Sequence, residues 1–122
     1  MAVPNLQSIF LPLLNFASDK KEHSIRETIK ILPKEFKLSK KEIDQILSDW
    51  SKTVFYDNVT WGITYLKKAG LLDSNKKGYF HITNRGLEVL NQKPSKIDTD
   101  FLLQYPEFAK FRRRPLRPKI KE

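Results

Sequence analysis

The chain has 122 residues, of which 39% are hydrophobic and 30% charged, a balance that suits one small globular domain with a tail. It has no cysteine, which excludes disulfides and thiolate metal sites and favours a reducing compartment. The stretch 1–16 is apolar but too short for a membrane span, and it lacks the basic opening of a signal peptide. We therefore expect a cytoplasmic protein with no membrane partner.

The sequence shows no motif of catalysis. His23 and His81 are too few and too far apart for a metal cage. No spacing of serine, histidine and aspartate indicates a nucleophile elbow, a phosphate loop or a zinc helix. Asp98 and Asp100 stand near a predicted helix start, where capping accounts for them. The residues therefore predict no enzyme within this chain, no metal and no cofactor.

Most of the positive charge lies near the C-terminal end. Residues 110–122 hold seven of the 23 basic residues and one of the 14 acidic ones, which is +6 of the net +9. Such an arm attracts polyanions by counterion release. A solubilising end or an interdomain linker explains it equally well. The charge balance alone therefore does not identify a DNA-binding fold.

Amphipathic helices are predicted through the first half of the chain. Apolar residues at i, i+3, i+4 and i+7 predict a helix over 5–16. Ser24 stands three residues before Glu27, and Ser39 stands three residues before Glu42, which is the spacing of a capping box. Each serine precedes an apolar stripe, so two further helices are expected to begin there.

In the stretch 56–83, the spacing of apolar residues changes at Gly70 from that of a helix to that of a strand. Asp57 or Asn58 is the predicted cap of a helix that ends at Gly70 with two lysines in its last turn. Beyond it, two short apolar runs flank 73–78, which predicts a β-hairpin with a glycine-containing turn. A recognition helix followed by a wing is typical of an α+β winged helix-turn-helix fold.

Further helices are predicted after the hairpin. Thr83 suits the N-cap of a helix that Pro94 closes. Asp98 or Thr99 begins one further helix, or two short ones interrupted at Pro106. The winged helix, with three or four helices and its hairpin, is thus expected to carry a helical C-terminal extension.

The predicted helix 57–70 has an apolar face and a polar face. Hydroxyls, a lysine and an aromatic ring on the polar face suit a DNA major groove, and a solvated helix face is the alternative. The residues expected to be buried are Val59, Gly62, Ile63, Leu66 and Gly70. Those expected to face outward are Asp57, Thr60, Trp61, Thr64 and Lys68, with Tyr65 and Lys67 on the flanks.

Three side chains of this stretch have two interpretations each. Trp61 on a polar face either packs under a neighbouring helix, which is favoured, or contacts a ligand. Lys76 and Lys77 at the hairpin tip either contact a phosphate backbone or serve a solvated turn.

The sequence motifs of the chain support a family resemblance. A tryptophan-containing helix ends in a leucine–lysine–lysine–alanine–glycine run, and an aromatic strand and a T-x-x-G helix start follow. The opening 3–14 has a proline and then an apolar helix, and 93–111 looks like a connector. Over nearly all of 1–111 the chain resembles the N-terminal winged-helix domain of Mrr-like restriction endonucleases. The matching residues are Trp61, Leu66, Lys67, Lys68, Ala69, Gly70, Gly78, Tyr79, Thr83 and Gly86.

The resemblance implies the DNA-recognition domain of a modification-dependent (type IV) restriction enzyme that acts on methylated DNA. In the family a separate C-terminal nuclease domain of the PD-(D/E)xK type cuts the DNA with Mg²⁺. That domain is absent from these residues, so no catalytic residue is carried over. We expect a fragment, an isolated domain or a short stand-alone relative, whose partners are double-stranded DNA, a nuclease domain in the parent protein and, as an option, a second copy.

The expected organisation has three parts. Residues 1–95 form the DNA-recognition domain, 96–111 a helical connector and 112–122 a basic, proline-containing arm or linker. The residues expected to contact base edges or the groove are Asn58, Thr60, Trp61, Thr64 and Lys68. Those expected to contact phosphates are Lys76, Lys77 and Arg85.

Two other functions fit the same residues. A protein-interaction or dimerisation winged helix would use Trp61 as an interface anchor. A transcriptional regulator would bind unmodified operator DNA as a dimer. The lysines discriminate DNA binding from protein interaction, because a DNA-binding face should gather Lys68, Lys76 and Lys77 in one patch.

Overall fold

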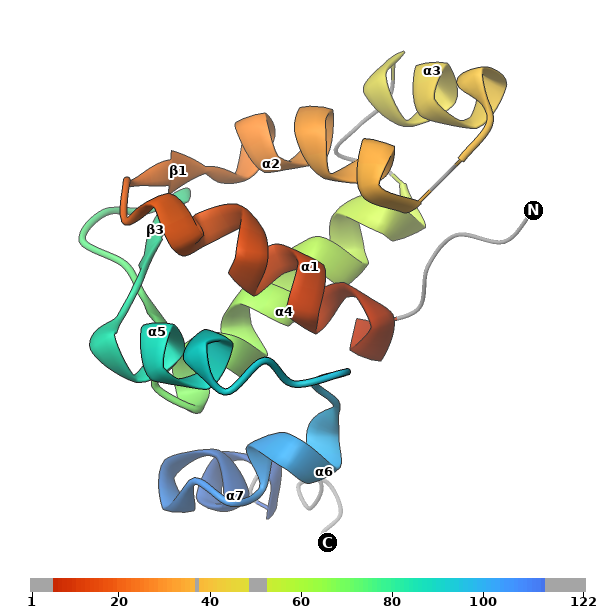
Figure 1. Cartoon of the computed structure of the whole chain (residues 1–122). Coiled ribbons are helices and arrows are strands. Elements are labelled where there is room, and N and C mark those ends of the chain that lie inside the picture. The colour runs from red at the N-terminus through yellow and green to blue at the C-terminus, as the bar shows by residue number, and fades with distance from the viewer. Residues whose placement is uncertain (1–5, 37, 49–52, 114–122) are drawn as a thin grey trace, which may run out of the picture.

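The computed structural model describes residues 6–36, 38–48 and 53–113 (Figure 1). Within these ranges the fold is α+β, with seven α-helices, two 3-10 helices and one small antiparallel sheet. Residues 114–122 of the predicted basic arm lie outside the described ranges. The elements in chain order are α1 (Leu6–Phe16), η1 (Ala17–Asp19), β1 (His23–Ser24), α2 (Ile25–Ile31), η2 (Leu32–Phe36), α3 (Lys40–Ser48), α4 (Val54–Lys68), β2 (Leu72–Asp73), β3 (Tyr79–Ile82), α5 (Asn84–Asn91), α6 (Thr99–Leu102) and α7 (Pro106–Arg113).

The sheet has the strand order β1-β3-β2. The strands β2 and β3 form the predicted hairpin, and β1 adds to its other edge by pairing His23 with Phe80. A bond of 2.9 Å from the Ile25 N–H to the Gly78 carbonyl ties the start of α2 to the hairpin. The two residues of β1 are too few to show an alternating pattern, so this strand is visible only in the structure.

The core forms mainly where α1 crosses α4 (Figure 1). Phe10 and Leu13 of α1 and Phe55 and Leu66 of α4 are fully buried. A Cβ on Gly62 would lie 3.4 Å from a methyl group of Leu13, so the glycine lets the two helices approach closely. Burying each of these large side chains contributes about 1.5–3 kcal/mol, which fixes one face of α4 against α1.

The caps predicted at Ser24, Ser39 and Thr83 are confirmed. Glu27 N–H donates to the Ser24 hydroxyl at 3.0 Å, and the Glu27 carboxylate accepts from the Ser24 N–H. Ser39 and Glu42 make the same reciprocal pair. The Thr83 hydroxyl accepts from the third residue of α5 at 3.1 Å. These bonds satisfy backbone donors that a helix start leaves without partners.

The prediction that α4 begins at Asp57 or Asn58 is wrong. The helix begins at Val54, and the hydroxyl of Thr53 caps it by accepting from the Tyr56 N–H at 3.0 Å. Any of the three residue types can cap, and the burial of Phe55 in the core decides in favour of the earlier start. The recognition-helix candidate therefore begins about one turn earlier than predicted, and it ends at Lys68, two residues before the predicted end at Gly70.

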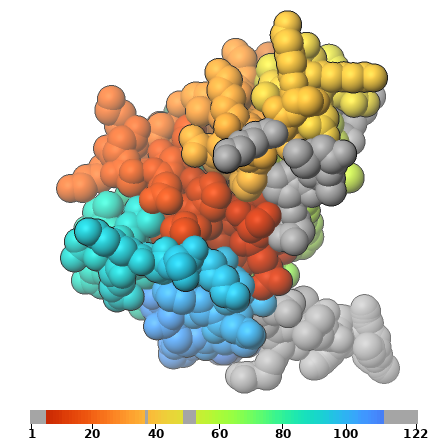
Figure 2. All heavy atoms as spheres, turned by 45° about the vertical axis from the view of Figure 1, so that its right-hand side comes forward, coloured from red at the N-terminus to blue at the C-terminus, as the bar shows by residue number. Residues whose placement is uncertain are grey.

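The helical C-terminal extension packs onto the rest of the chain. Asp98 caps α6, and the N–H of Thr99 donates to the Gln7 side chain at 2.9 Å. Leu102 and Phe108 are fully buried in the same hydrophobic core as α1 and α4. Figure 2 shows the extension, in blue, lying directly against α5 and the residues that follow it, in turquoise. The connector predicted over 96–111 thus shares its core with the preceding domain.

Candidate nucleic-acid interface

The surface of α4 divides into a buried face, a flank covered by α7 and an open face. The buried residues are Phe55, Val59, Gly62, Ile63 and Leu66, and they include four of the five predicted for burial. Gly62 lies against Leu13 of α1, and the Phe55 ring contacts Phe36 of η2. The helix α7 packs along the flank that carries Tyr65 and Lys68. The residues with partly or largely exposed side chains on the remaining face are Asp57, Thr60, Trp61, Thr64 and Lys67.

Two threonines on the open face donate to their own helix. The Thr60 hydroxyl donates to the Asp57 carbonyl at 2.9 Å, and the Thr64 hydroxyl donates to the Thr60 carbonyl at 3.1 Å. Each hydroxyl has thereby used its single proton and keeps acceptor lone pairs, with a methyl group beside them. The face can accept hydrogen bonds and offer small apolar contacts. Asn58, another predicted contact, is half-buried at the edge of this face.

Trp61 is largely exposed. Its relative exposure is 54%, and its ring stands edge-on to Tyr65 of the same helix, with the centroids 6.2 Å apart. The favoured prediction, that it packs under a neighbouring helix, is wrong for the described part of the chain. The indole is therefore available to a ligand or a partner.

Hydrogen bonds of Ser74 hold the backbone of the hairpin tip. The Ser74 hydroxyl lies within hydrogen-bond distance of the carbonyls of Lys76 and Tyr79, at 2.8 and 2.7 Å. The Lys76 ammonium stands 4.1 Å from the centre of the Tyr79 ring and 3.9 Å from a Glu22 oxygen. Lys77 is exposed. The tip therefore presents its two lysines from an ordered turn beside β1.

Arg85 joins three segments of the chain. Its Nη1 donates to the Ala69 carbonyl at 2.8 Å and to the Glu107 carboxylate at 3.1 Å. The guanidinium stands 4.7 Å from the centre of the Tyr105 ring. A Cβ on Gly70, whose φ is +83°, would lie 2.7 Å from this Nη1, so only glycine leaves room for the arrangement. Arg85 thus binds the end of α4 to α7.

Lys68 belongs to the α7 side of the molecule. Its ammonium lies 5.4 Å from the centre of the Phe111 ring. The three lysines expected in one patch therefore form two groups, with Lys68 beside α7 and with Lys76 and Lys77 at the hairpin tip. The single patch expected of a DNA-binding face is not formed by these three residues. The sequence does not reveal this division because α7 is distant from α4 along the chain.

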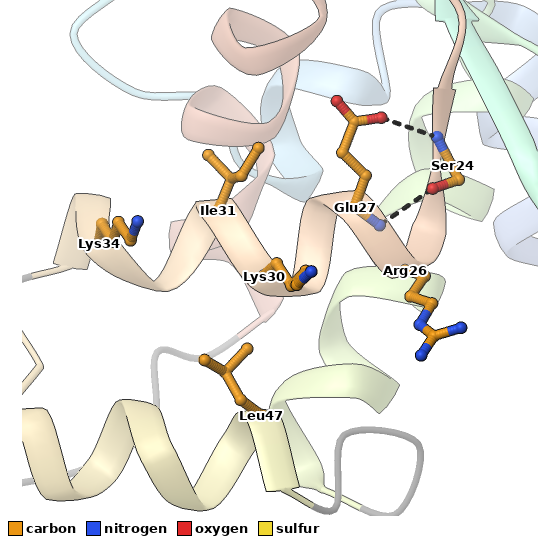
Figure 3. A pocket seen from close by; sticks show the side chains of 7 residues that line it. All are labelled: Ser24, Arg26, Glu27, Lys30, Ile31, Lys34 and Leu47. Atoms are coloured by element: carbon orange, nitrogen blue, oxygen red, sulfur yellow. Dashed lines mark hydrogen bonds between the residues drawn. The ribbon is translucent and has the colours of Figure 1, made fainter.

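A second basic surface lies along α2 and η2 (Figure 3). Arg26, Lys30 and Lys34 line an open hollow between α2 and α3, together with the exposed side chains of Ile31 and Leu47. The three cations recur at i, i+4 and i+8, which is the spacing of one face of an α-helix, with Arg26 and Lys30 in α2 and Lys34 in η2. That spacing is present in the sequence and is a signal that could have singled them out.

The described residues offer neither a metal site nor a membrane span. No three His, Cys, Asp or Glu side chains among them are grouped to hold a metal ion. None of the helices in the described ranges is both long and apolar enough to cross a membrane.

Comparison with known proteins gives one match. The family described as the Mrr N-terminal domain matches residues 6–92, which include every element from α1 to α5. The searches of curated proteins and of solved structures found no match. Because the matched residues make up well over half of the chain, the protein belongs to the Mrr N-terminal domain family.

Proposed function

We propose that this chain is a DNA-recognition domain associated with an Mrr-type restriction system. Family membership provides the association, and the open face of α4 carries the proposal structurally. That face offers threonine hydroxyls and an exposed indole on a helix anchored by its opposite side. A helix of this kind fits the major groove of B-DNA, which is wide enough to admit it.

The proposed fold is a winged helix-turn-helix. In support, α4 leads directly into the β2–β3 hairpin, and β1 joins the hairpin at the other edge of β3. The hairpin is then the wing, and the organisation into a domain over 1–95, a connector over 96–111 and an arm over 112–122 is part of the proposal.

In this proposal the residues of α4 make the contacts in the groove. Asn58, Thr60 and Thr64 contact base edges, and Lys68 contacts a base edge or a phosphate at the end of the helix. Trp61 offers an apolar surface for methyl groups, including those added by base methylation. Discrimination of methylated DNA would therefore depend most on Trp61.

The phosphate contacts are proposed to come from the wing. The hydrogen bonds of Ser74 fix the backbone of the turn that carries Lys76 and Lys77, so the turn presents both lysines to a phosphate backbone. Arg85 is less available for a phosphate contact than the two lysines, because its Nη1 already donates to the Ala69 carbonyl and to the Glu107 carboxylate. A phosphate would have to reach the other guanidinium nitrogens, and positioning α7 is the main role we propose for Arg85.

The test is binding to matched methylated and unmethylated duplexes across a salt series. The wild type should show a steep negative slope of log affinity against log salt. Lys76→Ala/Lys77→Ala should weaken binding by about tenfold and make the slope shallower by about 2. The charge-matched control is Lys93→Ala/Lys96→Ala, which removes two lysines from the segment between α5 and α6, outside the proposed contacts.

The salt series has two decisive outcomes. A wild-type slope near zero excludes DNA binding. Equal affinity for methylated and unmethylated duplexes leaves DNA binding in place and removes discrimination of methylation from this domain. Unchanged binding by the control, beside weakened binding by the wing variant, assigns the effect to the wing and not to net charge.

A protein-interaction function is the second candidate. Val54 and Trp61 are seven residues apart on one side of α4, and they are 61% and 54% exposed. Two such helices could bury these side chains against each other in a homodimer. Sedimentation velocity discriminates the two functions. If the chain is a protein-interaction module, the wild type is a dimer and Trp61→Ala dissociates it. If the chain is a DNA-recognition domain, Trp61→Ala changes DNA affinity and leaves the molecular mass in solution unchanged.

A further inference from the structure

A shallow hollow of about 380 Å³ lies where the end of α4 meets α7. The helix α7 follows the part of the chain that matches the family, so the match assigns nothing to this hollow. Three of its side chains are lysines, one is acidic and one is aromatic. The lining residues are Lys67, Lys68, Gly70, Glu107, Lys110 and Phe111.

The charge of the hollow is positive. Its single carboxylate, Glu107, pairs with the Arg85 guanidinium at 3.1 Å. A hydrogen bond from its own backbone N–H and a second from Arg85 hold the pKa of Glu107 below its ordinary value, so the pair stays ionised. This pair has no net charge, so among the residues that the structure describes the hollow has the net positive charge of Lys67, Lys68 and Lys110.

Packing fixes the two walls relative to each other. Phe108 is fully buried, and its ring lies 5.4 Å from that of Tyr65, centre to centre. The Phe111 ring lies 5.7 Å from Tyr65 and 5.4 Å from the Lys68 ammonium. Lys110 therefore faces the end of α4 from a helix that is held in place by aromatic contacts.

We propose that this hollow is a second site for the phosphate backbone of duplex DNA, which makes α7 part of the nucleic-acid surface. The inference rests on the proposed function and extends it to a helix outside the family match. Since α7 borders the open face of α4, a duplex that lies along this face passes Lys110. The backbone would then be held by the wing and by α7.

The site suits a polyanion better than a small anion. The carbonyl end of α4 lies here, and its partial negative charge disfavours a single isolated phosphate. A duplex brings many phosphates, and each one that lysine neutralises releases counterions. The three ammonium groups are exposed at a shallow surface, which fits a long backbone that passes over them.

The test compares two substitutions that change charge in opposite directions. Lys110→Ala should weaken duplex binding about three- to tenfold and make the salt slope shallower by about 1. Glu107→Gln removes the acidic group and leaves Arg85 uncompensated, so it should strengthen binding several-fold. Lys93→Ala is the control for loss of one lysine. Thermal unfolding of every variant should match that of the wild type to within a few degrees.

The outcomes separate this inference from the proposed function. If Lys110→Ala and Glu107→Gln both bind as the wild type does, while Lys76→Ala/Lys77→Ala binds weakly, the second site is excluded and the proposed function stands. A wild type without salt-dependent binding overturns both. If Lys110→Ala weakens binding of inorganic pyrophosphate but not of the duplex, the hollow is a small-anion site and the inference is wrong.

Discussion

The two sides of α4 differ in how they are held. One side is fixed by α1, with Phe10 fully buried, and the adjoining flank is fixed by α7 through Tyr65 and Phe108. On the open side, the hydroxyls of Thr60 and Thr64 donate only to their own helix. Stability and the proposed binding therefore depend on separate residues of one helix. Substitutions on each side should therefore have separate consequences.

The largest effect is expected where α4 is anchored. Phe10→Ala should lower the free energy of unfolding by about 3–5 kcal/mol, because it removes a buried ring and leaves a cavity between α1 and α4. Phe108→Ala should cost about 3 kcal/mol, since α7 can relax away from the cavity. Urea unfolding, followed by circular dichroism, measures both.

An exposed residue of α4 provides the control. Val54→Ala should change the free energy of unfolding by less than about 0.5 kcal/mol, because its side chain is 61% exposed. A cost below about 1 kcal/mol for Phe108→Ala would mean that α7 does not share the core, and the contrast between the sides of α4 would then be limited to its α1 contact.

Features that depend on residues close together in the chain, such as helix caps and the buried face of α4, can be predicted from the sequence. Capping boxes such as Ser24 with Glu27 depend on side chains that reach backbone groups three residues away, so spacing alone predicts them. The buried face of α4 follows from helical periodicity in the same way. Four of its five predicted buried residues are buried, and the fifth, Gly70, is half-exposed because it turns the chain away from the helix.

The parts that depend on tertiary contacts are not visible in the sequence. Arg85 and Glu107 are 22 residues apart, and nothing local indicates that they pair. The exposure of Trp61 depends on whether another element covers it, which helical periodicity cannot decide. The division of the lysines likewise follows from the docking of α7. Local physics thus predicts the elements and their faces, and packing decides which face remains open.

A smaller effect is expected from pH, and it concerns the β1 end of the molecule. The ring of His23 is buried, and its two nitrogens lie 2.9 Å from Asp19 and 3.0 Å from Glu27. Burial lowers the pKa of His23, but the hydrogen bonds to Asp19 and Glu27 outweigh it, and the net pKa is raised. A doubly protonated ring donates to both carboxylates, whereas a neutral ring can donate to only one.

The sign of the pH effect follows from the raised pKa. The stabilisation is fully present below the unfolded pKa of about 6.5 and is lost as pH rises through the higher folded value. Asp19 contributes to stability at the acidic end of the pH range. Hydrogen bonds from the Lys21 N–H and then from His23 lower the pKa of Asp19. Its contribution is therefore lost as pH falls below about 4.

Urea unfolding between about pH 5 and pH 9 measures the His23 contribution. The wild type should lose stability across this range, and His23→Gln should be less stable at the acidic end with a flatter dependence on pH. Equal pH dependence in the two proteins would show that His23 does not titrate differently on folding. Phe108→Ala should keep the wild-type dependence, because the α7 side does not include this histidine.

The smallest effect on stability is expected on the open face of α4. Thr60→Val/Thr64→Val keeps the shape of both side chains and removes hydroxyls that bond to carbonyls of their own helix. The free energy of unfolding should change by less than about 0.5 kcal/mol. Duplex affinity should fall about fivefold or more, since the acceptor atoms offered to base edges are lost. Unchanged duplex affinity of this variant would mean that the two hydroxyls do not contact base edges.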